Sequence, residues 1–195
     1  MAYDHRRGPR RRGEALEAAI LRAAFDELVE VGYGGLTMDR VAARAHTSKA
    51  SLYRRWPSRV ELAVHAVFHT LLPDPGAPPD TGSLRGDLLA LLRRSAQLLA
   101  GPAGEVVRAV LSETLHDPGR VAELHRFASV VEQGMQEVVR RAISRGEIVE
   151  TAVTPRRLEA GQALLRQHFL FNGPVVPDTV IVEIVDEVAI PLLSN

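Results

Sequence analysis

The chain has 195 residues, of which 46% are hydrophobic, 25% are charged and only 5% are aromatic, and it contains no cysteine. The missing thiols exclude disulfides and thiolate metal sites, and the absence of a signal-like segment or of an apolar run of about 18 residues favours a cytoplasmic protein. The net charge is zero, but residues 1–60 hold 12 basic and 7 acidic residues, against 12 and 17 in the remainder. This asymmetry indicates that the N-terminal part binds a polyanion.

Arginines dominate the first twelve residues, in the run from Arg6 to Arg12. Such a run is typical either of an arm that enters the minor groove of DNA or of an unstructured tail, and the sequence leaves both open. Helical spacing of apolar residues follows, at Leu16, Ile20, Ala24, Leu28 and Val31. We expect this first helix to end at Gly32, because glycine is favoured just after the end of a helix.

Residues 36–56 predict two short helices joined by a tight turn. Thr37 is suited to cap the first of them and Ser48 the second, since both side chains accept hydrogen bonds from free backbone N–H groups. Val41, Ala42 and Ala45 form the apolar face of the first helix, and Leu52 and Trp56 are the large buried residues of the second. The pattern predicts a helix-turn-helix whose exposed face comprises Lys49, Ala50, Ser51, Tyr53, Arg54 and Arg55.

Pro57 ends that helix, and Ser58 with Glu61 forms a capping box for a fourth helix that runs to about residue 72. Residues 73–82 contain four prolines and two glycines and therefore predict a linker. Beyond it we expect five helices, at about 83–100, 104–116, 117–145, 155–171 and from 177 onward. We therefore predict an all-α protein of nine helices, with a head at 1–60, a connecting helix to about 72 and a helical body at 73–195.

The helix-turn-helix resembles the signature of the TetR/AcrR family of bacterial transcriptional regulators over residues 14–65. The matching features are the pair Gly32-Tyr33, the cap Thr37, the pair Val41-Ala42, the turn 45–48 and the segment 52–56. His46 stands where the family usually has glycine, so we expect it to adopt a left-handed backbone, and Arg55-Trp56 replaces the usual His-Phe. The resemblance implies a homodimer that binds palindromic operator DNA, and a repressor released by a small effector.

The residues that we expect to contact DNA combine the helix-turn-helix positions with Arg59, which lies where the family commonly carries a phosphate-binding lysine. They are Thr37, Arg44, Thr47, Ser48, Lys49, Ala50, Ser51, Tyr53, Arg54, Arg55 and Arg59. We expect Lys49 and Arg44 to influence sequence preference, and Arg55 and Arg59 to bind phosphates.

The resemblance also implies an effector pocket among the helices of the body. All tyrosines and the tryptophan precede residue 60, so we expect a largely apolar ligand held by few polar contacts. Candidate pocket residues are Gln97, Arg108, His116, Phe127, Met135 and Phe169. We expect no cofactor, and no histidine pair has the spacing of a metal site.

The last two predicted helices carry apolar stripes that either fill the body or pair with a second copy in a four-helix bundle. We favour pairing through Leu158, Gly161, Leu165, His168, Ile184 and Val188. Val180, Ile184, Val185, Val188 and Leu192 are expected on the apolar side of the last helix.

Two other classes of function remain open. A small helical enzyme would use Glu113, His116 or Asp117 as acid and base, but the sequence has no nucleophile motif, phosphate loop or cofactor fingerprint, so we expect no enzyme. An architectural or partner-controlled DNA-binding protein would share the fold and lack the effector.

Overall fold

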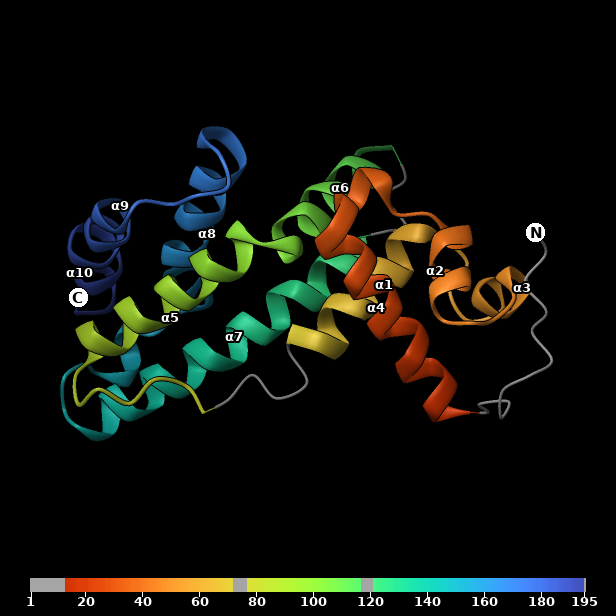
Figure 1. Ribbon diagram of the computed structural model, residues 1–195. Helices are drawn as coiled ribbons and strands as arrows, with labels where there is room; N and C mark the ends of the chain where they lie inside the picture. The colour runs from red at the N-terminus through yellow and green to blue at the C-terminus, as the bar shows by residue number, and fades with distance from the viewer. Residues whose placement is uncertain (1–12, 72–76, 117–120, 195) are drawn as a thin grey trace. The chain divides into compact units, whose positions relative to one another are not determined.

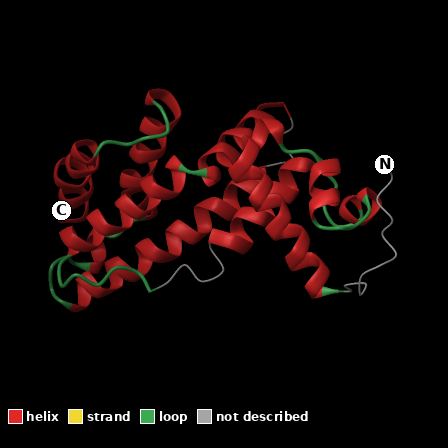
Figure 2. Cartoon of the chain, viewed as in Figure 1, coloured by secondary structure: helices red, strands yellow, loops and turns green. Residues whose placement is uncertain are grey.

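The structure is a computed structural model that describes residues 13–71, 77–116 and 121–194, with side chains for the same residues except 114–131. The chain divides into two compact units, residues 1–74 and 75–195. In the described part of the chain the secondary structure is entirely helical (Figure 2). The predicted all-α fold is confirmed.

Within the described residues, the first unit contains α1 to α4 and the second contains the remaining helices (Figure 1). The bounds in the first unit are α1 Glu14–Gly35, α2 Met38–Arg44, α3 Lys49–Tyr53 and α4 Arg59–Leu71. Those in the second are α5 Leu84–Ala100, α6 Pro102–His116, α7 Val121–Ser144, the 3-10 helix η2 Glu150–Ala152 and α8 Pro155–Asn172. A last helix follows, made of α9 Asp178–Glu183, the π-helical turn η3 Ile184–Ala189 and α10 Ile190–Ser194. The sequence had not predicted η2 or the π-helical turn, and the expected start of α7 at 117–118 lies outside the described residues.

The core of the first unit forms between α1 and α4, its most extensive helix pair. Ile20, Leu28, Leu52 and Leu62 are almost inaccessible to solvent, and Trp56 fills the centre as the sequence predicted. The helical conformation of α1 is interrupted at Gly32, whose φ of 66° suits glycine because it has no Cβ. The regular part of α1 thus ends at the predicted Gly32, and a short further segment to Gly35 leads toward α2.

Local hydrogen bonds fix where several helices begin. Ser58 accepts the N–H of Glu61 at 3.2 Å, which is one of the two bonds of the predicted capping box. Its hydroxyl also donates to the Glu61 carboxylate, at 3.2 Å. Ser83 caps α5 by accepting the N–H of Gly86, and Thr154 caps α8 by accepting that of Arg157. These caps depend on neighbouring residues only, which explains why the sequence located them.

The core of the second unit joins α5, α7, α8 and the last helix. Its most deeply buried side chains include Leu88, Leu92, Leu165, Phe169 and Val185. Small residues allow the helices to approach closely. A Cβ added at Gly161 of α8 would meet Ile184 at 3.6 Å and Ala189 at 3.7 Å.

The last helix buries a stripe of apolar residues, as predicted. After Val185, however, the buried positions lie one residue later in the sequence than expected. Ala189 and Leu193 are buried, whereas Val188 and Leu192 are only half-buried. The N–H of Ile190 bonds to the carbonyl of Val185, five residues back, so the π-helical turn contains an extra residue. Pro191 accounts for this turn, because it has no N–H to donate and its ring crowds the carbonyl four residues before it.

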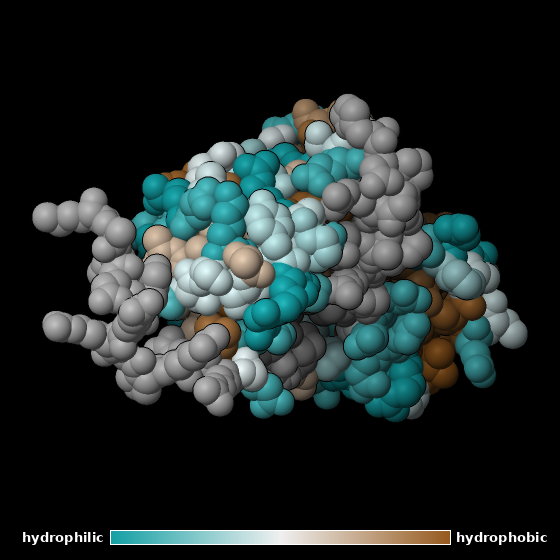
Figure 3. All heavy atoms as spheres, turned by 90° about the vertical axis from the view of Figure 1, so that its right-hand side faces the viewer, coloured by the Kyte–Doolittle hydropathy of each residue, from teal (hydrophilic) through white to brown (hydrophobic). Residues whose placement is uncertain are grey.

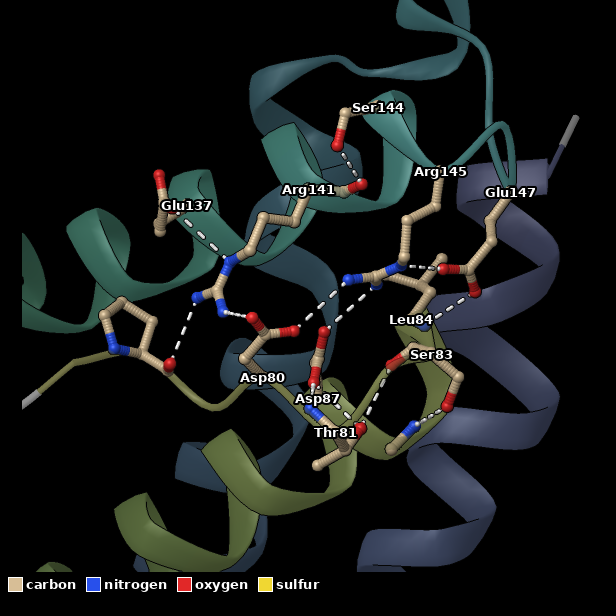
Figure 4. A network of polar contacts seen from close by, with 12 residues as sticks. Asp80, Thr81, Ser83, Leu84, Asp87, Glu137, Arg141, Ser144, Arg145 and Glu147 are labelled. Carbon is tan, nitrogen blue, oxygen red and sulfur yellow. Dashed lines mark hydrogen bonds and ion pairs between the residues drawn. The ribbon is translucent and has the colours of Figure 1, made fainter.

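A polar network fastens the segment 78–83, here called the strap, to α5 and the end of α7 (Figure 4). Asp87 is fully buried, and its carboxylate accepts both the N–H and the hydroxyl of Thr81, at 2.6 and 2.8 Å. Arg145 donates to Asp87 at 3.1 Å, and Arg141 donates to the carbonyl of Pro78 at 3.0 Å. Burial alone would raise the pKa of Asp87, but the hydrogen bonds of Thr81 and Arg145 outweigh it and hold this pKa below its ordinary value.

Two arginines of α5 bind the last helix through paired hydrogen bonds. Arg85 contacts the Asp186 carboxylate at 2.7 and 2.8 Å, and Arg93 contacts that of Asp178 at 2.6 and 2.8 Å. We call these pairs the arginine forks. Within the described residues, no helix combines the length and apolar character that a membrane span requires.

Candidate nucleic-acid interface

The segment from α2 to α3 forms the predicted helix-turn-helix. The hydroxyl oxygen of Thr37 accepts the N–H of Arg40 at 3.2 Å, which caps α2. The side chain of Ser48 accepts the N–H of Ser51 at 3.3 Å, which caps α3. Within the turn, the N–H of Thr47 bonds to the carbonyl of Ala42 at 2.9 Å. These bonds fix the angle between the two short helices.

His46 adopts the left-handed backbone expected from its place in the turn, with a φ of 52°. Among the described residues it is the only one other than glycine with a positive φ. A side chain in this conformation crowds the backbone, so the turn has some conformational strain.

The two sides of α3 differ as the sequence predicted, except that Ser51 is buried and Arg55 is half-buried. Leu52 is completely buried, while Lys49, Ala50, Tyr53 and Arg54 are exposed. Ser51 was expected on the exposed side, but only 8% of it is exposed, because it lies under Arg55, which donates to its hydroxyl and carbonyl oxygens at 3.2 Å. The exposed part of α3 is therefore narrower than predicted.

A hollow of about 370 Å³ lies where α2 turns into α3, lined by Asp39, Ala42, Ala43, His46, Thr47, Ser48 and Lys49. Two of these lining residues bond to each other, since Lys49 donates to Asp39 at 2.8 Å. This hydrogen bond raises the pKa of Lys49 above its usual value, so its ammonium group is charged at neutral pH. Among the residues that are not grey, hydrophilic ones predominate in Figure 3, which faces the end of Figure 1 that carries α2 and α3.

Two of the predicted DNA-binding arginines contact other parts of the same unit. Arg44 bonds to Glu27 and Glu30 of α1. The guanidinium of Arg59 stacks on the Tyr33 ring, 4.3 Å from its centre, and donates to the carbonyl of Leu36 at 3.2 Å. Their contacts join α1 to α2 and α4, a role that the sequence did not reveal. By contrast, the side chain of Arg54 has no ion pair or hydrogen bond within the described part of the chain.

The candidate pocket residues of the second unit lie in different environments. Phe169 and Met135 are buried, and the guanidinium carbon of Arg108 lies 4.0 Å from the centre of the Phe169 ring. Gln97 is exposed. The side chains of His116 and Phe127 lie outside the described residues, as does Asp117, so two of the three residues considered for an enzyme are not described. The sequence missed a buried polar pair between α5 and α8, in which Gln162 donates to Ser95 at 3.2 Å.

Half of the residues predicted to pair two copies belong to the core of the second unit itself. Gly161, Leu165 and Ile184 are buried, and Leu158, His168 and Val188 are half-buried. The apolar side chains that α8 and the following loop leave exposed are Leu164, Leu170, Phe171 and Val175. Apolar residues therefore occur on both the buried and the exposed side of α8. Periodicity alone could not tell which side packs against the core.

Comparison with known proteins relates both units to the same protein family. The family model described as bacterial regulatory proteins, tetR family, matches residues 20–66, and the one described as tetracyclin repressor-like, C-terminal domain, matches residues 78–188. An HTH-type transcriptional regulator of Mycobacterium bovis is 36% identical, with 92% of this chain and 88% of the relative covered. A DNA-binding transcriptional repressor TetR of Mycobacteroides abscessus is 34% identical, with 93% and 96% covered. The crystal structure of the TetR family transcription regulator SCO0332 superposes with a TM-score of 0.76 at 26% identity and covers 90% of this chain and 97% of its own.

Proposed function

The chain belongs to the TetR family of DNA-binding transcriptional regulators, and from this premise we propose that it is a homodimeric repressor of a palindromic operator. The observation that carries the proposal is the construction of α3. Ser48 caps this helix, and the buried Leu52 anchors it. The exposed side combines the small Ala50, which permits close approach to a groove, with Lys49, Tyr53 and Arg54 as hydrogen-bond donors.

The proposed dimer is held by the exposed side of α8. Leu164 and Phe171 are seven residues apart, which places them two turns apart on one side of the helix, and 78% of Phe171 is exposed. Leu170 and Val175 are also exposed, and we call these four apolar residues the α8 patch. A second copy related by a two-fold axis would cover this patch and would pair the two heads as a palindromic operator requires.

Effector release is proposed to act through the second unit, with Arg108, Phe169 and Met135 among the candidate lining residues. An effector lowers operator affinity only when it binds the DNA-incompetent form more tightly. Operator DNA must then weaken effector binding by the same factor.

One experiment tests operator binding and pairing together. Immobilised full-length chain is mixed with duplexes of random sequence, and the retained DNA is amplified and sequenced. We expect a palindromic motif whose half-sites are separated by about one helical turn or a multiple of it. A single half-site would contradict the dimer, and no enrichment at all would contradict the regulator.

The selected operator then serves to test the effector. Apolar compounds that raise the melting temperature are titrated with and without saturating operator. A compound whose affinity falls in the presence of operator supports the repressor with an effector. If every binding compound is indifferent to the operator, the architectural or partner-controlled alternative is favoured.

A further inference from the structure

A buried carboxylate joins the first two helices of the DNA-binding unit. Only 3% of Glu27 is exposed, and it lies on the side of α1 that faces α2. It accepts hydrogen bonds from the Nε atoms of both Arg40 and Arg44, the latter at 2.7 Å. A buried charge is costly unless it is paired and hydrogen-bonded, and here two cations pair with one acid.

The arginines of this cluster are matched by carboxyl groups. Burial would raise the pKa of Glu27, but the hydrogen bonds from Arg40 and Arg44 outweigh burial and hold this pKa below its ordinary value. Arg44 also bonds to Glu30, an exposed residue one turn further along α1. The cluster therefore sets two arginines against two carboxyl groups.

The two arginines lie where an unpaired cation would affect DNA binding. They are one turn apart on α2, the first helix of the helix-turn-helix, which crosses the phosphate backbone in proteins of this type. Their side chains are 47% and 31% exposed, so both guanidinium groups are partly open to solvent. An arginine that is free to rotate here would bind phosphates of any sequence and add affinity without selectivity.

We propose that Glu27 is a specificity-determining residue, which holds Arg40 and Arg44 on α1 and so keeps them from phosphates. The inference rests on the proposed function and deepens it. Sequence-independent affinity is then limited, and the choice of DNA depends on α3. Arg44 acts by positioning α2 and not by reading bases.

The test compares Glu27→Gln with the wild type on the selected operator and on a random duplex of equal length, over a series of salt concentrations. The amide cannot hold two guanidinium groups, so we expect random DNA to bind about tenfold more tightly at low salt. The slope of log K against log salt should steepen by roughly one for each arginine released. Operator binding should change less, so the ratio of operator to random affinity should fall.

Two further variants control for charge and for folding. Glu17→Gln makes the same charge change at an exposed position of α1 and should leave the slope near that of the wild type. Glu30→Gln loses only the exposed partner of Arg44 and should steepen the slope by a smaller amount. This variant decides the question if Glu27→Gln does not melt cooperatively.

A double-mutant cycle identifies the arginines as the cause. In the Arg40→Gln/Arg44→Gln background, the further change Glu27→Gln should no longer tighten binding to random DNA. If Glu27→Gln instead weakens both duplexes and lowers the melting temperature, the residue has a structural role only and the inference is wrong. A wild type that selects no DNA would overturn the proposed function itself, whereas a selective wild type with an unchanged variant overturns this inference alone.

Discussion

Asp87 and Arg145 form an ion pair, with 3.1 Å between Oδ2 and Nη2. The carboxylate of Asp87 is fully buried, whereas the guanidinium of Arg145 lies at the surface of the second unit. The same carboxylate receives two hydrogen bonds from Thr81, so one side chain joins the strap, α5 and the end of α7. Removal of the Asp87 carboxylate should therefore weaken the contacts among the strap, α5 and the end of α7.

We predict that Asp87→Asn lowers the free energy of unfolding by about 2 kcal/mol, because the amide replaces a buried carboxylate that accepts hydrogen bonds from Thr81 and Arg145, and its NH₂ group cannot accept any. Urea denaturation followed by circular dichroism measures this change. Arg93→Gln is the matched control, since it removes an ion pair that is largely exposed, and its effect should be small. If Asp87→Asn lowers the free energy of unfolding no more than Arg93→Gln does, the polar network around Asp87 contributes little to stability.

The stability of the protein should fall in acid. Glu27 and Asp87 both have pKa values lowered in the folded state, from 4.5 and 3.8 respectively. The unfolded chain therefore binds their protons first as the pH falls, and stability is lost below these values and retained above them. We expect the urea midpoint to be level between about pH 7 and 5 and to decline below about pH 4.5. In Glu27→Gln this decline should be shallower.

Lys49 and Arg54 should affect DNA binding in different ways. Lys49→Gln should weaken the operator about tenfold and random DNA much less, because the loss of a base contact affects one sequence. Arg54→Gln should weaken both duplexes and flatten the salt slope by about 0.9 for one lost phosphate contact. Fluorescence anisotropy at several salt concentrations separates the two effects, with the exposed Arg22→Gln of α1 as control. If each variant loses the same affinity for operator as for random DNA, Lys49 and Arg54 do not differ in their roles.

The α8 patch should be required for pairing and not for folding. Phe171→Asp should give a folded monomer in sedimentation, because its side chain lies outside the core and a charge there would oppose contact with a second copy. Ile184→Asp, at a buried position, should instead unfold the second unit. A stable Phe171→Asp dimer would place the interface elsewhere.

The turn at His46 offers a prediction about backbone strain. His46→Gly should keep or slightly raise the melting temperature, because the strain relieved in the left-handed region offsets the greater freedom of glycine in the unfolded chain. His46→Val should cost about 1 kcal/mol or more, since a β-branched side chain fits this region poorly. The same melting temperature for both variants would show that the turn tolerates any residue.

The sequence predicted those features that depend on neighbouring residues. The caps at Thr37, Ser48 and Ser58 and the positive φ of His46 follow from short-range geometry, and each was found where expected. The family resemblance was likewise carried by a continuous segment. Local chemistry therefore located the helix-turn-helix closely.

The partners of the charged residues could not be predicted in this way. Arg44 and Glu27 are 17 residues apart, and Arg145 and Asp87 are 58 apart, so their pairing depends on how whole helices pack. The buried stripe of the last helix was misjudged for another reason. Periodicity assumes a uniform number of residues per turn, and the π-helical turn before Pro191 changes that number.

The arginine forks have a mechanical consequence for any motion inside the second unit. Arg85 and Arg93 are eight residues apart on α5, and their partners Asp186 and Asp178 are also eight apart, in the opposite order. Sliding of the last helix along α5 by a single turn, about 5 Å, would therefore break both pairs at once. The two helices should therefore move together as one rigid body. A rearrangement that leaves the forks intact has to take place at other helix contacts.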